Sequence, residues 1–187
     1  LDEIRRLGCD TICLLPIHDI GAPQAYAEDW PAAQPEDLYA LRSFAMLDPR
    51  LGDGAALAAL VAAAHERRLR VVLDLPLSGC AADSPYVGDH PDWFSRDQGG
   101  QEIRFTGAVD TFCFEWHDAD MRALAVREAI ALLQQADLDG FRVLVARDLP
   151  PGWAVGAAHG GGNLNVARLV AELYVALHQS RPSAALL

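Results

Sequence analysis

The sequence has few cysteines and no long apolar run. Its four cysteines, Cys9, Cys13, Cys80 and Cys113, lack both metal-site spacing and the density of a disulfide framework. We expect Cys9 and Cys13, which fall in a short apolar segment, to be ordinary buried residues. No apolar stretch approaches the roughly 18 residues of a membrane-spanning helix. These absences argue against a disulfide-stapled scaffold, and we predict no membrane partner.

Basic residues are also scarce, with 15 against 26 acidic ones, and the resulting net charge of −11 is spread along the chain. Such a surface repels nucleic acid and anionic membranes, so we predict no nucleic-acid partner. A neutral ligand such as a sugar is compatible with it. The sequence starts at Leu1 and shows no secretory signal, which favours the cytoplasm without fixing the compartment.

Helical and strand-like patterns alternate along the 187 residues, of which 51% are hydrophobic. The short apolar runs are typical of strands buried on both faces, so the alternation predicts a parallel α/β sheet within one domain. Two long segments follow the first two strands, where barrel enzymes place their functional loops. The pattern leaves open a (β/α) barrel of TIM type and a doubly wound open sheet. The expected helices are 1–7, 54–68, 118–136 and 165–179, and the expected strands are 9–17, 70–77, 138–146 and a run beginning at 183.

The segment 70–80, RVVLDLPLSGC, follows a helical stretch and carries a carboxylate, Asp74, near the end of a strand pattern. A helix, a buried strand, an acidic residue near the strand's carboxyl end and then a loop form the order in which α/β barrels build active sites. We therefore centre the search for a functional site on Asp74.

Several segments in the right order resemble the catalytic domain of the α-amylase family, glycoside hydrolase family 13. They are 8–17 (GCDTICLLPI), 39–53 (YALRSFAMLDPRLGD), 63–80 (AAHERRLRVVLDLPLSGC), 90–97 (HPDWFSRD) and 138–146 (LDGFRVLVA). The resemblance implies that residues 1–187 form a partial TIM-type barrel running from the second strand to the start of the fifth. It also implies a short inserted domain B at residues 81–115.

The family's chemistry, retaining hydrolysis or transfer at α-glucosidic bonds, needs carboxylates that this sequence lacks. The resemblance places the nucleophile at Leu144, which cannot attack a sugar, and the general acid beyond the last residue. Ser78 and Gly79 replace the family's Asn-His pair, which removes the calcium-ligating amide and an imidazole that contacts the sugar. Ser43 and Phe44 replace an Asp-Tyr pair. We therefore predict an inactive chain with no catalytic residue, no metal site and no cofactor.

Tyr39, Asp74 and Arg142 do match family positions, and the resemblance implies that they contact the substrate, an α-glucan or maltooligosaccharide. Each also has a simpler interpretation: Tyr39 as a half-buried loop aromatic, and Asp74 as the partner of Arg142 within the sheet. The alternative function is a non-catalytic sugar-binding or scaffolding module derived from the family. In either case we expect the missing barrel half, or a partner chain, to cover the open edge.

Other polar groups favour structural roles. His18 is expected to be a loop histidine with a solvated neighbour, Asp19, and Asp148 is expected in a surface turn. The glycine-rich segment 159–163 is expected to be a flexible connection. His117, Asp118 and Asp120 resemble a metal cluster but stand where helix-capping residues belong. Of the four tryptophans, we expect two to pack the core of the insertion rather than to bind sugar: Trp93 and Trp116.

Overall fold

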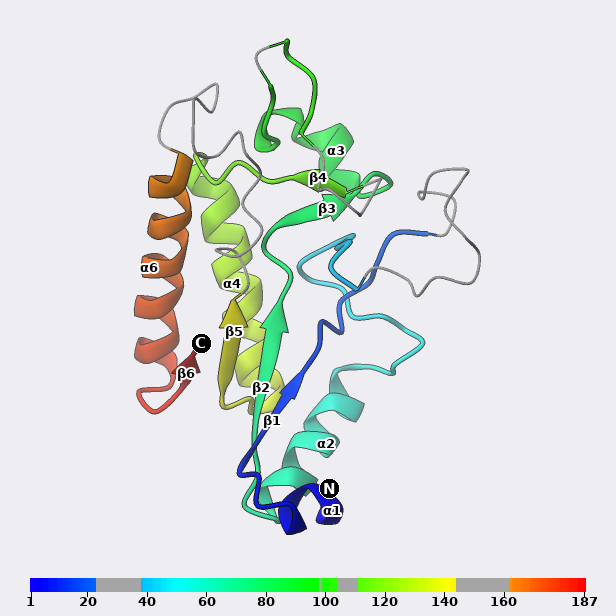
Figure 1. The fold of residues 1–187 in the computed structure, drawn as a ribbon, viewed down its shortest axis with the longest axis vertical. Helices are drawn as coiled ribbons and strands as arrows, with labels where there is room; N and C mark the ends of the chain where they lie inside the picture. The colour runs from blue at the N-terminus through cyan, green and yellow to red at the C-terminus, as the bar shows by residue number, and fades with distance from the viewer. Residues whose placement is uncertain (23–37, 98, 104–110, 144–161) are drawn as a thin grey trace.

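The computed structural model describes residues 1–22, 38–97, 99–103, 111–143 and 162–187, and the chain runs from α1 to β6 (Figure 1). Within these residues, no helix is long and apolar enough to cross a membrane. The helical elements are α1 (Asp2–Arg6), α2 (Gly54–His65), α3 (Pro85–Asp89), the 3-10 turn η2 (Pro91–Trp93), α4 (Ala119–Ala136) and α6 (Gly162–Ser180). The strands are β1 (Thr11–Leu14), β2 (Arg70–Leu75), β3 (Gly79–Ala81), β4 (Thr111–Cys113), β5 (Gly140–Val143) and β6 (Ala185–Leu186).

The main sheet has four strands in the order β1-β2-β5-β6, and every neighbouring pair is parallel. The strands follow one another around the sheet in chain order. A doubly wound sheet would reverse its order at a switch point, so this order is that of a barrel segment. The structure thus confirms the expected parallel sheet, and the TIM-type interpretation holds.

Helix boundaries follow from local chemistry. The Asp53 side chain accepts the Ala56 N–H at 2.8 Å, and the Asp118 side chain accepts the Met121 N–H at 2.7 Å. Each carboxylate satisfies a backbone donor that the first helical turn leaves unpaired. Gly8, just beyond α1, has a φ of +86°, a left-handed conformation that favours glycine. These caps occur where the sequence predicts them.

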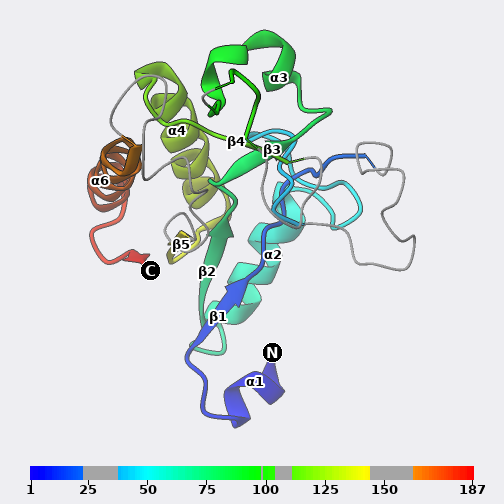
Figure 2. The same ribbon diagram turned by 45° about the horizontal axis from the view of Figure 1, so that its top comes forward.

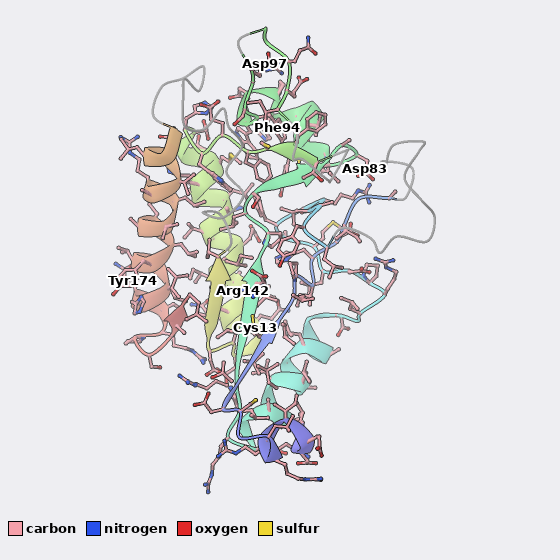
Figure 3. The ribbon with its side chains drawn as sticks, in the orientation of Figure 1. Cys13, Asp83, Phe94, Asp97, Arg142 and Tyr174 are labelled. Atoms are coloured by element: carbon pink, nitrogen blue, oxygen red, sulfur yellow. The ribbon has the colours of Figure 1, made fainter. Side chains whose placement is uncertain are left out.

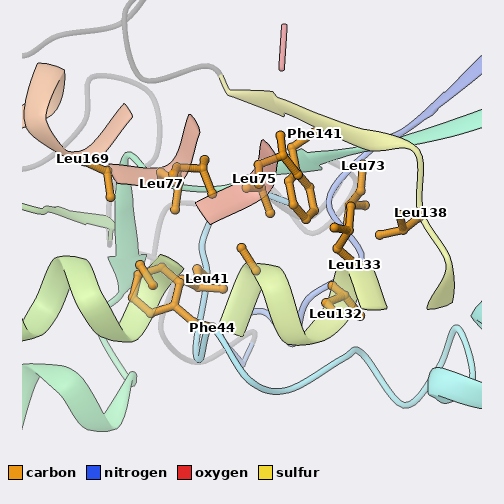
Figure 4. Packing of buried hydrophobic residues seen from close by; sticks show 14 of the residues in the cluster. Leu41, Phe44, Leu73, Leu75, Leu77, Leu132, Leu133, Leu138, Phe141 and Leu169 are labelled. Atoms are coloured by element: carbon orange, nitrogen blue, oxygen red, sulfur yellow. The ribbon is translucent and has the colours of Figure 1, made fainter. Parts of the chain in front are cut away.

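One face of the sheet forms the main core. Leu73 and Phe141 are fully buried and lie on the same face of adjacent strands, since they are paired in register. Helices α2, α4 and α6 cover this face, with Leu133 of α4 packed beneath the strands (Figures 1 and 4). Because side chains alternate along a strand, Cys13, Asp74 and Arg142 point to the opposite face. In a closed barrel this opposite face would be the interior.

The segment between β2 and α4 forms a small lobe above the carboxyl ends of the strands (Figures 1 and 2). Strands β3 and β4 pair antiparallel, and the aromatic rings of Phe94, Phe114 and Trp116 lie against the main core. Trp93 is 4% exposed and Trp116 is 1% exposed. Both tryptophans are therefore buried, but they belong to the main core cluster rather than to a separate core of the insertion. The assignment of residues 81–115 as domain B stays a prediction.

The expected burial of Cys9 and Cys13 is wrong, because both side chains are exposed. Cys9 precedes β1, and β1 is an outer strand that pairs with β2 alone. Cys13 lies on the same face of the sheet as Arg142, and the two are labelled near each other in Figure 3. An apolar strand pattern predicts two buried faces, but at the outer strand β1 the face opposite the helices leaves Cys13 exposed.

Candidate functional site

Tyr39, Asp74 and Arg142 meet at the face of the sheet opposite the helices. Asp74 is the fifth residue of β2, and Arg142 lies directly opposite on β5 in the parallel register. Tyr39 comes from the long loop that follows β1, and its hydroxyl group reaches Asp74 on β2. Three elements far apart in sequence thus bring a carboxylate, a guanidinium group and a phenol together.

One carboxylate oxygen of Asp74 accepts hydrogen bonds from both Tyr39 and Arg142. The Tyr39 hydroxyl donates to Asp74 Oδ2 at 2.5 Å, and an Nη2 hydrogen of Arg142 is bonded to the same oxygen. Arg142 Nη2 also lies 3.4 Å from the Tyr39 oxygen, which closes a triangle. Asp74 is 0% exposed, so its charge is tolerated because Arg142 neutralises it inside the protein. The expected pairing of Asp74 with Arg142 is confirmed.

The surroundings set the protonation of two of these groups. Burial, together with the hydrogen bond to Asp74, raises the pKa of Tyr39 to about 12. The hydrogen bond to Asp74 raises the pKa of Arg142 above its already high usual value. At neutral pH, Tyr39 is therefore a neutral donor and Arg142 a cation. Neither group is poised to transfer a proton.

The accessible part of this cluster is its rim. Asp74 Oδ1 and Arg142 Nε are buried atoms without a hydrogen-bond partner among the described residues. The Arg142 side chain is 34% exposed and Tyr39 is partly exposed, so both cover Asp74. A ligand at this face would therefore meet a fixed aromatic ring and a guanidinium group. Both kinds of surface suit a hydroxyl-rich, uncharged molecule, through stacking and hydrogen bonds.

The positions that depart from the family pattern have structural partners instead. The Ser78 carbonyl accepts the Phe114 N–H at 3.1 Å, and Gly79 begins β3 by pairing with Cys113. Phe44 is 7% exposed, and its ring centre lies 5.5 Å from that of Tyr86. These residues fasten the lobe and the loop to the core. The nucleophile position, Leu144, lies outside the described residues.

The remaining sequence candidates form no second site in the part of the chain that the structure describes. Asp118 caps α4, and no group of three metal-ligating side chains occurs among the described residues. His18 lies in the loop after β1, as predicted, where it forms an isolated bridge with Leu47, and its side chain is 4% exposed. Its neighbour Asp19 pairs with Arg42 at 3.6 Å. Asp148 and most of segment 159–163, about which the sequence analysis makes predictions, lie outside the described residues.

A cavity of about 390 Å³ lies elsewhere, between β1, α2 and the segment around Leu51. Its walls are mainly leucine and isoleucine side chains, including Leu14 on the helix-facing side of β1. Asp74 points to the other face of the sheet. Ligand sites combine apolar walls with a few converging polar groups, and those groups converge at Asp74 rather than here.

The sequence interpretation missed one polar cluster, at the opposite end of the strands. His65 Nε2 lies 2.8 Å from Asp139 Oδ2, although 74 positions separate the two residues. A charged residue in a largely apolar strand run, such as Asp139, is the available signal that a partner exists. The identity of that partner follows from the fold alone.

Comparison with known proteins gives consistent relatives, although no family model matches the chain. An α-1,4-glucan:maltose-1-phosphate maltosyltransferase of Rhodospirillum rubrum is 37% identical over 103 residues, covering 50% of this chain and 15% of that protein. The enzyme of the same name from Salinibacter ruber is 35% identical over 107 residues, covering 50% and 16%. The chain therefore matches less than a fifth of the length of these curated relatives.

Solved structures agree on the fold. An α-amylase from Lactobacillus plantarum superposes with a TM-score of 0.77 at 24% identity, covering 99% of this chain and 38% of that one. A maltogenic α-amylase from Thermotoga neapolitana gives a TM-score of 0.65 at 27% identity, covering 82% and 35%. The likeness extends over nearly the whole of the chain and over a minor part of each neighbour.

Proposed function

We propose that this chain, which is part of an α-amylase-family (glycoside hydrolase family 13) catalytic domain, keeps a sugar-binding surface but does not cleave glycosidic bonds. The observation that carries the proposal is the convergence of Tyr39, Asp74 and Arg142 on one face of a barrel sheet. The three residues match family positions by sequence, and they meet in space. The substrate class is an α-glucan or maltooligosaccharide.

Inactivity follows from what surrounds this cluster in the sequence. A retaining glycosidase needs a carboxylate nucleophile and a protonated carboxyl group about 5–5.5 Å apart, on either side of the scissile bond. The nucleophile position holds Leu144. Asp74 cannot replace it, because this carboxylate is fully buried and already bonded to Tyr39 and Arg142.

The outer strands of the sheet also imply a partner for it. Strands β1 and β6 are its outer strands, and each pairs with one other strand among the described residues. A closed barrel of this type has eight strands. Further strands, in a longer chain or in a partner chain, would cover the edges and enclose Tyr39 and Arg142. This coverage would bury Cys13 and complete the walls of the sugar site.

The alternative is a scaffold that binds no sugar. Calorimetry with maltotriose separates the two functions, because a sugar-binding surface releases heat of binding without continued turnover. Tyr39→Ala removes the ring and should weaken binding about tenfold, the upper range for one aromatic contact. Tyr39→Phe keeps the ring and should bind more tightly than Tyr39→Ala.

The matched control is Tyr174→Ala, which removes a tyrosine that is 53% exposed on α6, away from Arg142 (Figure 3). This variant should bind maltotriose like the unchanged chain. Absence of heat at millimolar maltotriose from a folded chain would favour the scaffold and reject the sugar-binding proposal.

A further inference from the structure

The cluster of His65 and Asp139 lies at the end of the sheet opposite the loops. His65 is the last residue of α2, and Asp139 immediately precedes β5. The 2.8 Å contact between His65 Nε2 and Asp139 Oδ2 ties the helix to the start of the strand. The side chains are partly shielded, with 32% of His65 and 20% of Asp139 exposed.

Asp139 is hydrogen-bonded to both the backbone carbonyl and the backbone N–H of Val71 on the neighbouring strand β2. Its own N–H donates to the Val71 carbonyl at 2.8 Å, and its Oδ2 atom accepts the Val71 N–H at 2.7 Å. A carboxylate oxygen thus takes the place of a backbone acceptor beside β2. This two-point attachment fixes the position at which β5 begins to pair with β2.

The same residue reaches the third strand. The Asp139 carbonyl accepts the Ala185 N–H at 2.9 Å at the start of β6. Arg181, in the turn after α6, lies 3.6 Å from Asp139 Oδ1 and also pairs with Asp137. Asp137 Oδ2 lies 3.5 Å from His65 Nδ1. Four segments of the chain are therefore joined around one carboxylate.

The register of β5 decides whether the sugar-site cluster exists. A slip of one residue would turn Arg142 into the core and Phe141 out of it, so burial of Phe141 opposes that slip. A slip of two residues keeps both faces correct but moves Arg142 away from Asp74 by about 6–7 Å. The alternating pattern of the four-residue strand does not exclude this second slip. The attachment of Asp139 to Val71 does.

We infer that His65 and Asp139 are positioning residues, a clasp that sets the register of β5 and so places Arg142 opposite Asp74. Val71 lies three residues before Asp74, and Asp139 lies three residues before Arg142, so pairing Asp139 with Val71 also pairs Arg142 with Asp74. Its functional meaning rests on the proposed sugar surface, but its effect on Arg142 does not. The clasp is therefore testable without any sugar.

The test reads Arg142 directly by ¹⁵N NMR of arginine side chains, with its signal assigned by its loss in Arg142→Met. In the unchanged chain, the buried bond to Asp74 should give Arg142 a resolved, slowly exchanging Nη signal. His65→Ala should abolish that signal, because Asp139 loses the contact that holds it. His65→Gln, whose amide can still donate to Asp139, should restore the signal at least in part.

The matched control is Asp2→Ala, which removes the acceptor of the 2.7 Å bond from Arg67 Nε at the same end of α2 without touching β5. It should leave the Arg142 signal unchanged. If His65→Ala melts at a lower temperature yet keeps the Arg142 signal, the residue is merely structural and the inference is overturned. If His65→Ala does not fold, Asp139→Leu decides, since it keeps a similar side-chain volume but removes the oxygen that accepts the Val71 N–H. An unchanged Arg142 signal in that variant also overturns the inference.

Discussion

Asp74 is the residue on which the candidate site is built, because both Tyr39 and Arg142 bond to its carboxylate. The carboxylate is buried, and removing either its charge or its cation would leave a polar group unpaired, which is costly in a protein interior. Tyr39 and Arg142 are therefore fixed by stability as well as by any ligand. The geometry therefore gives this cluster a structural role that holds whether or not a ligand binds.

His18 gives a prediction on pH dependence. Burial lowers the pKa of His18 to about 4, and its Nδ1 atom has no hydrogen-bond partner among the described residues. The unfolded chain binds a proton at His18 near pH 6.5, whereas the folded chain does so near pH 4. The contribution of neutral His18 to the free energy of unfolding is fully present above pH 6.5. It is lost as the pH falls from 6.5 to about 4, a decrease of about 3 kcal/mol in all.

Urea unfolding of the chain and of His18→Gln between pH 7.5 and pH 4 measures this contribution. The variant lacks the titrating group, so its free energy of unfolding should fall less steeply on acidification. Parallel curves for the two proteins would mean that His18 does not titrate in the predicted way.

Among the secondary-structure elements, β5 is the most constrained. Gly140 has a φ of +150°, and a Cβ atom at this position would lie 2.1 Å from the Ala185 carbonyl oxygen on β6. Gly140→Ala should therefore destabilise the chain by roughly 1–3 kcal/mol through backbone strain, and by more if β6 separates from β5. Chemical denaturation gives the free energy, and hydrogen exchange at Leu187, which donates to the Phe141 carbonyl, reports on the strand pair.

Gly88→Ala is the control for this prediction. Gly88 lies in α3, and a Cβ atom added there would meet no other atom within 4 Å, so alanine should be neutral or stabilising by up to about 1 kcal/mol. Equal losses of stability in the two variants would show that the close approach of β6 to Gly140 is unimportant.

Much of the element pattern could be predicted from the sequence because its causes are local. Asp53 and Asp118 cap the helices that follow them, and Gly8 ends α1, by rules that involve a few neighbouring residues. The exposure of Cys13 and the burial of His18 could not be predicted in this way. They depend on which face of the sheet is covered and on where the long loop after β1 returns to the strand. The partnership of His65 with Asp139 likewise arises from tertiary structure.

At the scale of the whole molecule, the chain is a curved parallel sheet with helices on one face and loops at one end. Such a sheet normally closes on itself, so that inward side chains form a filled interior. Here the inward face carries Asp74 and Arg142, and it remains accessible at Cys13 and Arg142. The candidate site was predictable at this scale because the resemblance places Tyr39, Asp74 and Arg142 at matching positions. The hydrogen-bonded triangle among them depends on tertiary structure, which the sequence pattern does not specify.

The most direct test of the central claim is product analysis by anion-exchange chromatography after prolonged incubation with maltotriose, in parallel with Asp74→Asn. A chain that keeps a sugar surface without a nucleophile should leave maltotriose intact, with no glucose or maltose above the level of the buffer. Release of these sugars by the pure chain, abolished in Asp74→Asn, would contradict the account.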